Sequence, residues 1–178
     1  ERSRGLGDVY KRQLLHTMIA SKQGASVIVS DVNEERLEVA KQLGAKYTIN
    51  PAKENLEQRI LEITNGLKAQ VIFDTTPLPS VVGDTFKCVC NAGKIVLYSS
   101  IHPAEPVPFD PNWVHGKSIK ILGTANSNDR DFVRAARMVS EGVIDLKPFV
   151  SAVYESEQIK EAFESAIQGD KFRVVVKF

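Results

Sequence analysis

The sequence predicts an α/β fold built around a doubly wound parallel sheet. Short apolar runs alternate with amphipathic segments of helical length, and glycine or proline closes most of these segments. One apolar run, over 26–30, ends in an acidic residue, Asp31. Strands that are joined by helices of this length run parallel, with right-handed crossovers. A chain of 178 residues is long enough to bury a core of this kind.

The expected elements follow one another regularly as far as residue 139. The expected strands are 26–30, 46–49, 71–73, 94–98 and 118–122. The expected helices are 14–22, the segment between Asp31 and the capping Gly44, the segment with Leu56, Ile60 and Ile63, and then 80–89 and 128–139. The segment 102–111 holds four prolines, so it is expected to be a loop.

The end of the chain has a different pattern. Residues 143–153 are mostly extended and are broken by Pro148. Ser156 is expected to cap a helix, and 172–177 to form a last strand. Because this order does not continue the alternation, we expect one domain over 14–150 and, over 151–178, a return segment that belongs to another domain.

Composition and charge exclude several classes of protein. The 23 basic and 22 acidic residues leave no basic field for nucleic acid or for an anionic membrane surface. No apolar run approaches the roughly 18 residues of a membrane span, and the start of the chain lacks the apolar core of a signal peptide. Cys88 and Cys90 are poorly spaced for a disulfide or a Cys-x-x-Cys metal site, so we expect buried thiols in a cytoplasmic protein.

Asp31 is the most informative single residue. A carboxylate at the carboxyl end of the second strand of a nucleotide-binding fold accepts hydrogen bonds from the adenosine ribose hydroxyls. It also repels the extra phosphate of NADP, so it favours NAD. The simpler alternative is that Asp31 only starts the following helix as its N-cap, a role that Asn33 could share.

Five segments, taken in order, are similar to the zinc-containing medium-chain dehydrogenases. They are DVNEERLEVAKQLGA, AQVIFDTT, NAGKIVLYSS, KSIKILGT and ESEQIKEAFESAIQGDKFRVVVKF. Within that family the chain most resembles the polyol and threonine dehydrogenases, over roughly residues 14–178. The sharper marks are the pair Asp31 and Arg36 and the closing Gly-x-x-x-Arg from Gly169 to Arg173. The resemblance implies a Rossmann-type sheet that binds NAD.

The resemblance implies cofactor contacts for three charged residues. Asp31 would hold the adenine ribose, and Arg36 would lie against the adenine or the ribose. Arg173 would reach the cofactor pyrophosphate, which suits a guanidinium group. The simpler alternatives are that Arg36 is a solvated helix residue paired with a glutamate, and that Arg173 is a charge at a strand edge.

The resemblance also implies contacts on the nicotinamide side of the cofactor. Thr75, Thr76 and Ser99 would line it, and the backbone near Leu122 would meet the carboxamide. The first three follow expected strands, and ligands of such sheets bind at the carboxyl ends of the strands. The alternative is that these three residues merely end strands.

The chain departs from the family at its start. The family's first strand and Gly-x-Gly-x-x-Gly turn would lie just before Leu14, where this chain has ERSRGLGDVYKRQ. No apolar strand precedes Gly5 and Gly7, and no third glycine follows in register. Residues 1–13 resemble a translated sequencing adapter, and we expect them to be a non-native scar.

A missing first strand has structural consequences. That strand is central in the order 3-2-1-4-5-6, so we expect either a gap between its two neighbours or those neighbours pulled together. The segment 6–10 has too few apolar residues for a buried central strand. We expect instead a first helix over about 9–22, with residues 1–7 poorly ordered or a loose strand.

The function expected from the resemblance is that of a cofactor-binding fragment. In the parent enzyme, hydride would pass from a secondary alcohol or polyol to NAD, with zinc polarising the alkoxide. Catalytic residues and zinc ligands would lie outside this chain, since His16, His102 and His115 lack metal-ligand spacing. The fragment alone is therefore expected to be inactive.

Two other functions stay open. One is a zinc-free quinone or enoyl reductase of the same superfamily, whose members commonly use NADPH. The other is a nucleotide-binding or S-adenosylmethionine-binding module. For assembly, the apolar segments 118–122 and 145–150 are expected at the far edge of the sheet, where strands tend to pair. The resemblance implies that this edge joins its copy in a homodimer or homotetramer.

Overall fold

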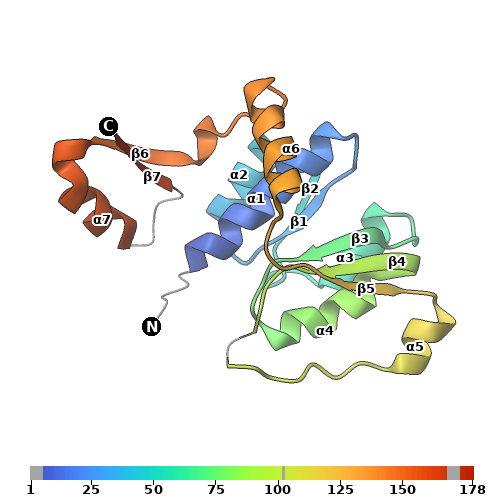
Figure 1. Ribbon diagram of the computed structural model, residues 1–178. Coiled ribbons are helices and arrows are strands. Elements are labelled where there is room, and N and C mark those ends of the chain that lie inside the picture. Colours follow the sequence, from blue (N-terminus) through green and yellow to red (C-terminus); the bar gives the residue numbers. More distant parts are fainter. Residues whose placement is uncertain (1–5, 102, 168–172) are drawn as a thin grey trace. The chain divides into compact units, whose positions relative to one another are not determined.

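The computed structural model describes residues 6–101, 103–167 and 173–178 (Figure 1). The chain divides into two compact units. One unit is His16–Ala125, and the other combines Glu1–Leu15 with Asn126–Phe178. Helix α1 (Leu6–Lys22) passes from the second unit into the first.

The unit His16–Ala125 has the alternating order that the sequence predicts. After α1 it contains β1 (Ile28–Ser30), α2 (Glu34–Gln42), β2 (Tyr47–Ile49), α3 (Leu56–Ile63), β3 (Ala69–Asp74), α4 (Pro79–Cys88), β4 (Val89–Leu97), α5 (Pro111–Gly116) and β5 (Lys120–Gly123). The short helix α5 is not among the expected elements. It forms because Pro111 occupies the first turn and the Asp110 side chain caps it, accepting a hydrogen bond from the Asn112 N–H.

The strands of this unit form two parallel sheets. Strand β1 pairs with β2, with Ile28 opposite Tyr47, while β3, β4 and β5 pair in that order. In the described part of the chain, no ladder joins β1 to β3. The predicted α/β fold with parallel strands is confirmed. Of the two outcomes expected at the place of the first strand, a gap or neighbours pulled together, the missing ladder between β1 and β3 corresponds to the gap.

A shared apolar core connects the two sheets. Ile49 of β2, Ile60 of α3 and Cys88 of α4 form one buried cluster, and Val89 and Ile95 of β4 with Ile119 form a second. Ile72 of β3 packs against both clusters. Packing against α3 and α4 therefore holds the sheets together where backbone hydrogen bonds do not.

Helix α1 corrects one expectation. It begins at Leu6, three residues before the expected start, so Leu6 and Gly7 are helical rather than loose. Gly7 lies in the first turn, where its N–H needs no acceptor within the helix, so a glycine there costs little. The rest of the expected loose segment, residues 1–5, lies outside the described residues.

The predicted helix cap at Gly44 is confirmed. Gly44 has φ +105°, and a Cβ at this position would lie within 2.8 Å of the Ser21 side chain on α1. The end of α2 thus approaches α1 closely, and only glycine fits there without strain.

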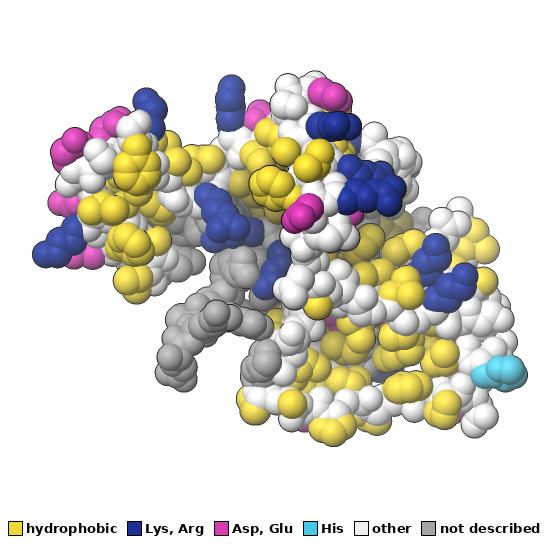
Figure 2. Space-filling view, viewed as in Figure 1, with side chains coloured by type: hydrophobic (Ala, Val, Ile, Leu, Met, Phe, Trp, Pro, Cys, Tyr) yellow, Lys and Arg dark blue, Asp and Glu magenta, His cyan; other side chains and the backbone are white. Residues whose placement is uncertain are grey.

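The second unit contains the end of the chain. Its elements are α6 (Asp129–Ser140), the 3₁₀ turn η1 (Lys147–Phe149), β6 (Val150–Glu155), the 3₁₀ turn η2 (Ser156–Gln158), α7 (Ile159–Ile167) and β7 (Arg173–Lys177). Strands β6 and β7 pair in parallel. Hydrophobic side chains lie on the surface of this unit, among them Phe163 and Ile167 of α7 (Figure 2).

Two expectations for this unit are wrong in detail. Glu155, not Ser156, is the helix cap, because Glu155 and Gln158 form a reciprocal capping box. The segment 145–150 is not an edge strand of the larger sheet: Lys147–Phe149 is a 3₁₀ turn, and β6 pairs with β7. Pro148 favours the turn because it fixes φ and has no N–H to donate to a ladder.

Candidate functional site

Asp31 lies directly after β1. Its backbone N–H donates to the Ile49 carbonyl, 3.2 Å away, and so continues the pairing of β1 with β2. Its Oδ1 accepts a hydrogen bond from the Asn33 N–H at 2.9 Å, and its Oδ2 lies 3.7 Å from Arg36 Nη1. The Asp31 side chain is only 12% exposed, so the carboxylate is held at one place at the strand's end.

The cap of α2 is Asn33, not Asp31. The Asn33 side chain accepts a hydrogen bond from the Arg36 N–H at 3.1 Å. The simpler alternative, in which Asp31 is the N-cap of α2, therefore does not hold, because Asn33 is the cap. Asp31 instead places a negatively charged carboxylate at the carboxyl end of β1, where ligands of parallel sheets bind.

Arg36 lies in the first turn of α2 and pairs with Asp31. Its side chain is 28% exposed. A partly exposed pair of this length contributes little to stability, about 0–1 kcal/mol. The pair does put a positive and a negative group side by side at the end of β1, where a ribose and its substituents would meet both.

The carboxyl ends of β3 and β4 are tied together by hydrogen bonds. Ser99 Oγ donates to the Thr75 carbonyl at 2.5 Å, and the Tyr98 N–H donates to the Asp74 carbonyl at 2.8 Å. Thr76 donates both its N–H and its Oγ–H to Asp74 Oδ1, each at 2.9 Å. The structure thus brings together three residues that the sequence predicted for the nicotinamide side, namely Thr75, Thr76 and Ser99.

Asp74 also belongs to this cluster, and it is not among the site residues predicted from the sequence. It is only 4% exposed, and its Oδ2 has no hydrogen-bond partner among the described residues. Burial raises the pKa of the Asp74 carboxyl, and the two hydrogen bonds from Thr76 oppose that rise. The sequence did hold a signal, because Asp74 comes directly after the apolar run 71–73, just as Asp31 comes after the run 26–30. The expectation that 71–73 is buried is wrong, since Val71 and Phe73 are 44% and 46% exposed.

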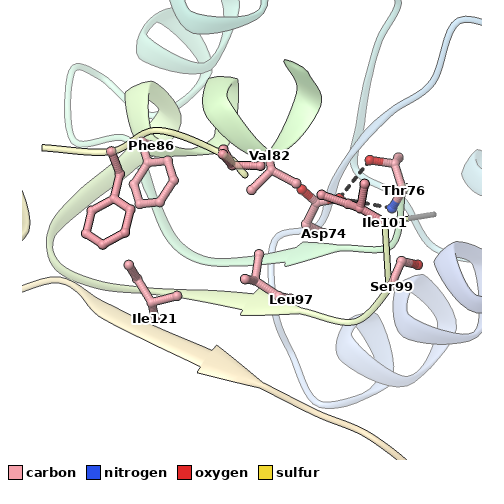
Figure 3. Close-up of a pocket in the computed structure, with 10 residues that line it drawn as sticks. Asp74, Thr76, Val82, Phe86, Leu97, Ser99, Ile101 and Ile121 are labelled. Carbon is pink, nitrogen blue, oxygen red and sulfur yellow. Dashed lines mark hydrogen bonds between the residues drawn. The ribbon is translucent and has the colours of Figure 1, made fainter. Parts of the chain in front are cut away.

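A cavity of about 170 Å³ adjoins the ends of β3 and β4. Asp74, Thr76 and Ser99 supply its polar lining (Figure 3). The rest is apolar and includes Val82 and Phe86 of α4. A buried carboxyl at the wall of an apolar cavity is a common feature of small-molecule sites.

Two predicted residues take no part in the hydrogen bonds and ion pairs of these clusters among the described residues. Leu122 is in β5, opposite Val96 of β4, and is 44% exposed. Arg173 is exposed at the start of β7, opposite Val150, in the other unit.

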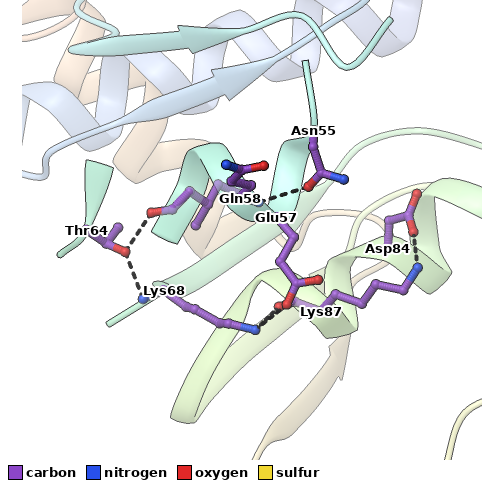
Figure 4. A network of polar contacts seen from close by, with 8 residues as sticks. Asn55, Glu57, Gln58, Thr64, Lys68, Asp84 and Lys87 are labelled. Carbon is purple, nitrogen blue, oxygen red and sulfur yellow. Dashed lines mark hydrogen bonds and ion pairs between the residues drawn. The ribbon is translucent and has the colours of Figure 1, made fainter. Parts of the chain in front are cut away.

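Charged side chains of α3, of α4 and of Lys68, which follows α3, form a network of their own (Figure 4). Lys68 Nζ lies 2.7 Å from Glu57 Oε1, and Lys87 Nζ lies 2.9 Å from Asp84 Oδ1. These acids are therefore neutralised by neighbouring lysines. In the described ranges, no three His, Cys, Asp or Glu residues lie close enough to share a metal ion.

Both cysteines are free thiols, and Cys88 is buried. Burial raises the pKa of the Cys88 thiol to about 11, so it is protonated and unreactive near neutral pH. None of the helices described is both long and apolar enough to cross a membrane.

Comparison with known proteins agrees with this geometry. Residues 14–141 match the family model for zinc-binding dehydrogenases, and the match contains both Asp31 and the Asp74 cluster. The chain belongs to the zinc-binding dehydrogenase family. The resemblance inferred from the sequence is confirmed.

Among curated relatives, a 2-dehydro-3-deoxy-L-galactonate 5-dehydrogenase of Pseudoalteromonas atlantica is 32% identical over 145 residues, which cover 82% of this chain and 42% of the relative. An L-threonine 3-dehydrogenase of Pyrococcus horikoshii is 28% identical over 165 residues, which cover 91% of this chain and 47% of the relative. The solved structure of an NAD-dependent alcohol dehydrogenase superposes on this chain with a TM-score of 0.73 at 26% identity. The match covers 93% of this chain and 47% of the solved one. The chain thus spans less than half the length of each of these proteins.

Proposed function

We propose that this chain is the cofactor-binding part of an NAD-dependent dehydrogenase that oxidises a secondary alcohol or polyol. The observation that carries the proposal is the position of the Asp31 carboxylate at the carboxyl end of β1. Asp31 does not cap α2, because Asn33 does. The similarity to dehydrogenases of sugar acids and amino acids supports an alcohol substrate. The similarity to a solved NAD-dependent alcohol dehydrogenase supports the cofactor.

The donor set fits the adenosine end of NAD. A carboxylate accepts hydrogen bonds from both ribose hydroxyls, and each charge-assisted bond contributes about 1.5–3 kcal/mol. A 2′-phosphate would instead meet a like charge at the same place. Arg36 would lie against the adenine or the ribose, and Arg173 would pair with the pyrophosphate.

The nicotinamide end would lie at the ends of β3, β4 and β5. Thr75, Thr76 and Ser99 would line it, and the backbone of Leu122 would meet the carboxamide. The hydrogen bond from Ser99 to Thr75 fixes the two strand ends relative to each other, so this wall would be formed before the cofactor arrives. When bound, NAD would accept the hydride from the alcohol carbon; this chain would bind and orient it.

The remaining parts of the proposal concern the parent protein. Zinc and its ligands, with the catalytic residues, would lie outside this chain, so the chain alone would be inactive. Residues 1–13 would be non-native, 14–150 would form the cofactor-binding domain, and 151–178 would return to the catalytic domain. The free thiols favour the reducing cytoplasm, and the parent would be a homodimer or homotetramer.

The test is a calorimetric titration of the chain with NADH, NADPH and S-adenosylmethionine. We expect NADH to bind tightest, and Asp31→Ser to weaken NADH by roughly tenfold or more while reducing the preference for NADH over NADPH. Glu38→Ser is the matched control, since it removes an exposed acid from α2 and should leave both affinities unchanged. A preference for NADPH would favour the reductase alternative, and binding of S-adenosylmethionine would contradict the dehydrogenase assignment.

A further inference from the structure

Asn50 is a buried polar residue that follows β2 directly. It is 6% exposed and stands between Ile49, the last residue of β2, and Pro51. It belongs neither to the pair of Asp31 and Arg36 nor to the cluster around Asp74. A buried side-chain amide has to satisfy both its donors and its acceptor, so its partners show which segments it holds in place.

The partners of the Asn50 amide lie on two different segments. Its Nδ2 donates to the Val32 carbonyl at 3.2 Å and to Oε1 of Glu34, the first residue of α2. Its Oδ1 accepts from the Ala52 N–H at 3.0 Å, within its own segment. One side chain thus fastens the connection between β1 and α2 to the end of β2.

The same connection carries Asp31. The Asp31 N–H donates to the carbonyl of Ile49, and the carbonyl of the next residue, Val32, accepts from Asn50. Two consecutive residues of the connection are therefore anchored to two consecutive residues at the end of β2. The Val32 side chain is 66% exposed, so hydrogen bonds rather than packing hold the backbone next to Asp31.

Glu34 reinforces this anchor. It also pairs with Lys53 Nζ at 2.7 Å, and its hydrogen bonds to Lys53 and Asn50 lower the pKa of the Glu34 carboxyl. The carboxylate is therefore ionised near neutral pH and acts only as an acceptor. An amide donor at position 50 suits this acceptor, whereas a second carboxylate there would be repelled by it.

We propose that Asn50 is a positioning residue of the ribose site, which acts through Asp31 rather than through contact with the nucleotide. The inference rests on the proposed function, because it concerns the site that Asp31 would provide for the ribose of NAD. The Asn50 amide holds the connection in place before the nucleotide arrives. The cost of ordering this segment is then not paid during binding, and the affinity for NAD rises.

The test removes the two donors of the Asn50 side chain. Asn50→Asp keeps the size of the side chain and replaces the amide nitrogen by an oxygen. Asn50→Ser is a second, uncharged variant that keeps the test decisive if the aspartate variant is not folded, which circular dichroism checks. Asn55→Asp is the matched control: Asn55 caps α3 (Figure 4), and aspartate caps equally well while adding the same charge.

Calorimetry with NADH compares these variants with the wild-type chain. We expect both Asn50 variants to bind NADH roughly three- to tenfold more weakly, and Asn55→Asp to bind it as the wild type does. The decisive comparison is a double-mutant cycle with Asp31→Ser. In that background, substitution of Asn50 should change the affinity by less than about twofold, because no carboxylate is left to position. An equal loss in both backgrounds would indicate general structural damage and would overturn the proposal.

A measurement without cofactor separates this inference from the proposed function. Amide hydrogen exchange, followed by NMR, reports the opening of the bond from the Asp31 N–H to Ile49. We expect exchange at Asp31 to be roughly three- to tenfold faster in the Asn50 variants, and exchange at Gln58, in the first turn of α3, to be unchanged. Unchanged exchange at Asp31 would overturn the anchor whether or not NADH binds. A wild-type chain that binds no NADH would overturn the proposed function and this role together, whereas wild-type affinity in the Asn50 variants would overturn this role alone.

Discussion

The Asp31 carboxylate lies 3.7 Å from the Arg36 guanidinium, and these two side chains meet at the carboxyl end of β1. Arg36 reaches that place because its own backbone N–H is bound by Asn33, which starts α2 in register. Asn33 and Asp31 thus both contact Arg36, one through its backbone N–H and the other through its guanidinium group.

Arg36→Ala should increase the discrimination against NADPH. The guanidinium offsets part of the negative field of Asp31, so its removal leaves a 2′-phosphate facing the carboxylate alone. We expect a modest loss of NADH affinity and a larger, roughly tenfold, loss for NADPH, both measured by calorimetry. Lys41→Ala removes a basic residue from the same helix and serves as the control. Equal losses for the two cofactors would contradict this view of the pair.

Asn33→Ala should destabilise the chain by about 0.5–2 kcal/mol, because α2 loses the acceptor for the Arg36 N–H. Asn33→Asp should restore most of the loss, since aspartate is an equally good cap. Urea unfolding followed by circular dichroism measures both. If the aspartate variant were as unstable as the alanine variant, capping would not be the role of Asn33.

The stability of the chain should depend on the ionisation of Asp74. Its pKa is raised in the folded protein, so its favourable contribution is complete below the pKa of the unfolded chain and is lost as pH rises through the folded pKa. Asp74→Asn removes this titration. We expect the variant to gain stability relative to the wild type as the pH of urea unfolding is raised from acid to neutral.

Asp84→Asn is the control for that experiment, because Asp84 is exposed on α4 and pairs with Lys87. Its difference from the wild type should not grow towards neutral pH. A constant difference between Asp74→Asn and the wild type at every pH would refute the linkage.

Ile95→Ala should cost about 2–5 kcal/mol of unfolding free energy, because the side chain is fully buried in β4 within the second core cluster. Ile167→Ala is the matched control, since Ile167 is 81% exposed on α7 and its loss should change stability by less than about 0.5 kcal/mol. Similar costs at the two positions would mean that β4 is not part of the stable core.

Much of the fold could be predicted because each element carries its own local signals. Gly44 ends α2 at a positive φ, and Asn128 caps α6 by accepting from the Asp131 N–H, as their sequence contexts indicate. Helix α5 was missed because its signal, Asp110 followed by Pro111, lies at the end of a proline-rich loop. Pro148 does not distinguish an extended segment from the observed 3₁₀ turn in the sequence, because its fixed φ suits both.

By itself, the sequence determined the alternation of parallel strands and helices, the position of Asp31 at a strand's end and the family. These depend on short-range periodicity and residue order. Only the tertiary structure decided that Asn33 rather than Asp31 caps α2, and that Asp74 is buried with one oxygen that has no hydrogen-bond partner among the described residues. Both outcomes depend on distances between side chains and on exclusion of water by packed elements, which residue order alone does not specify.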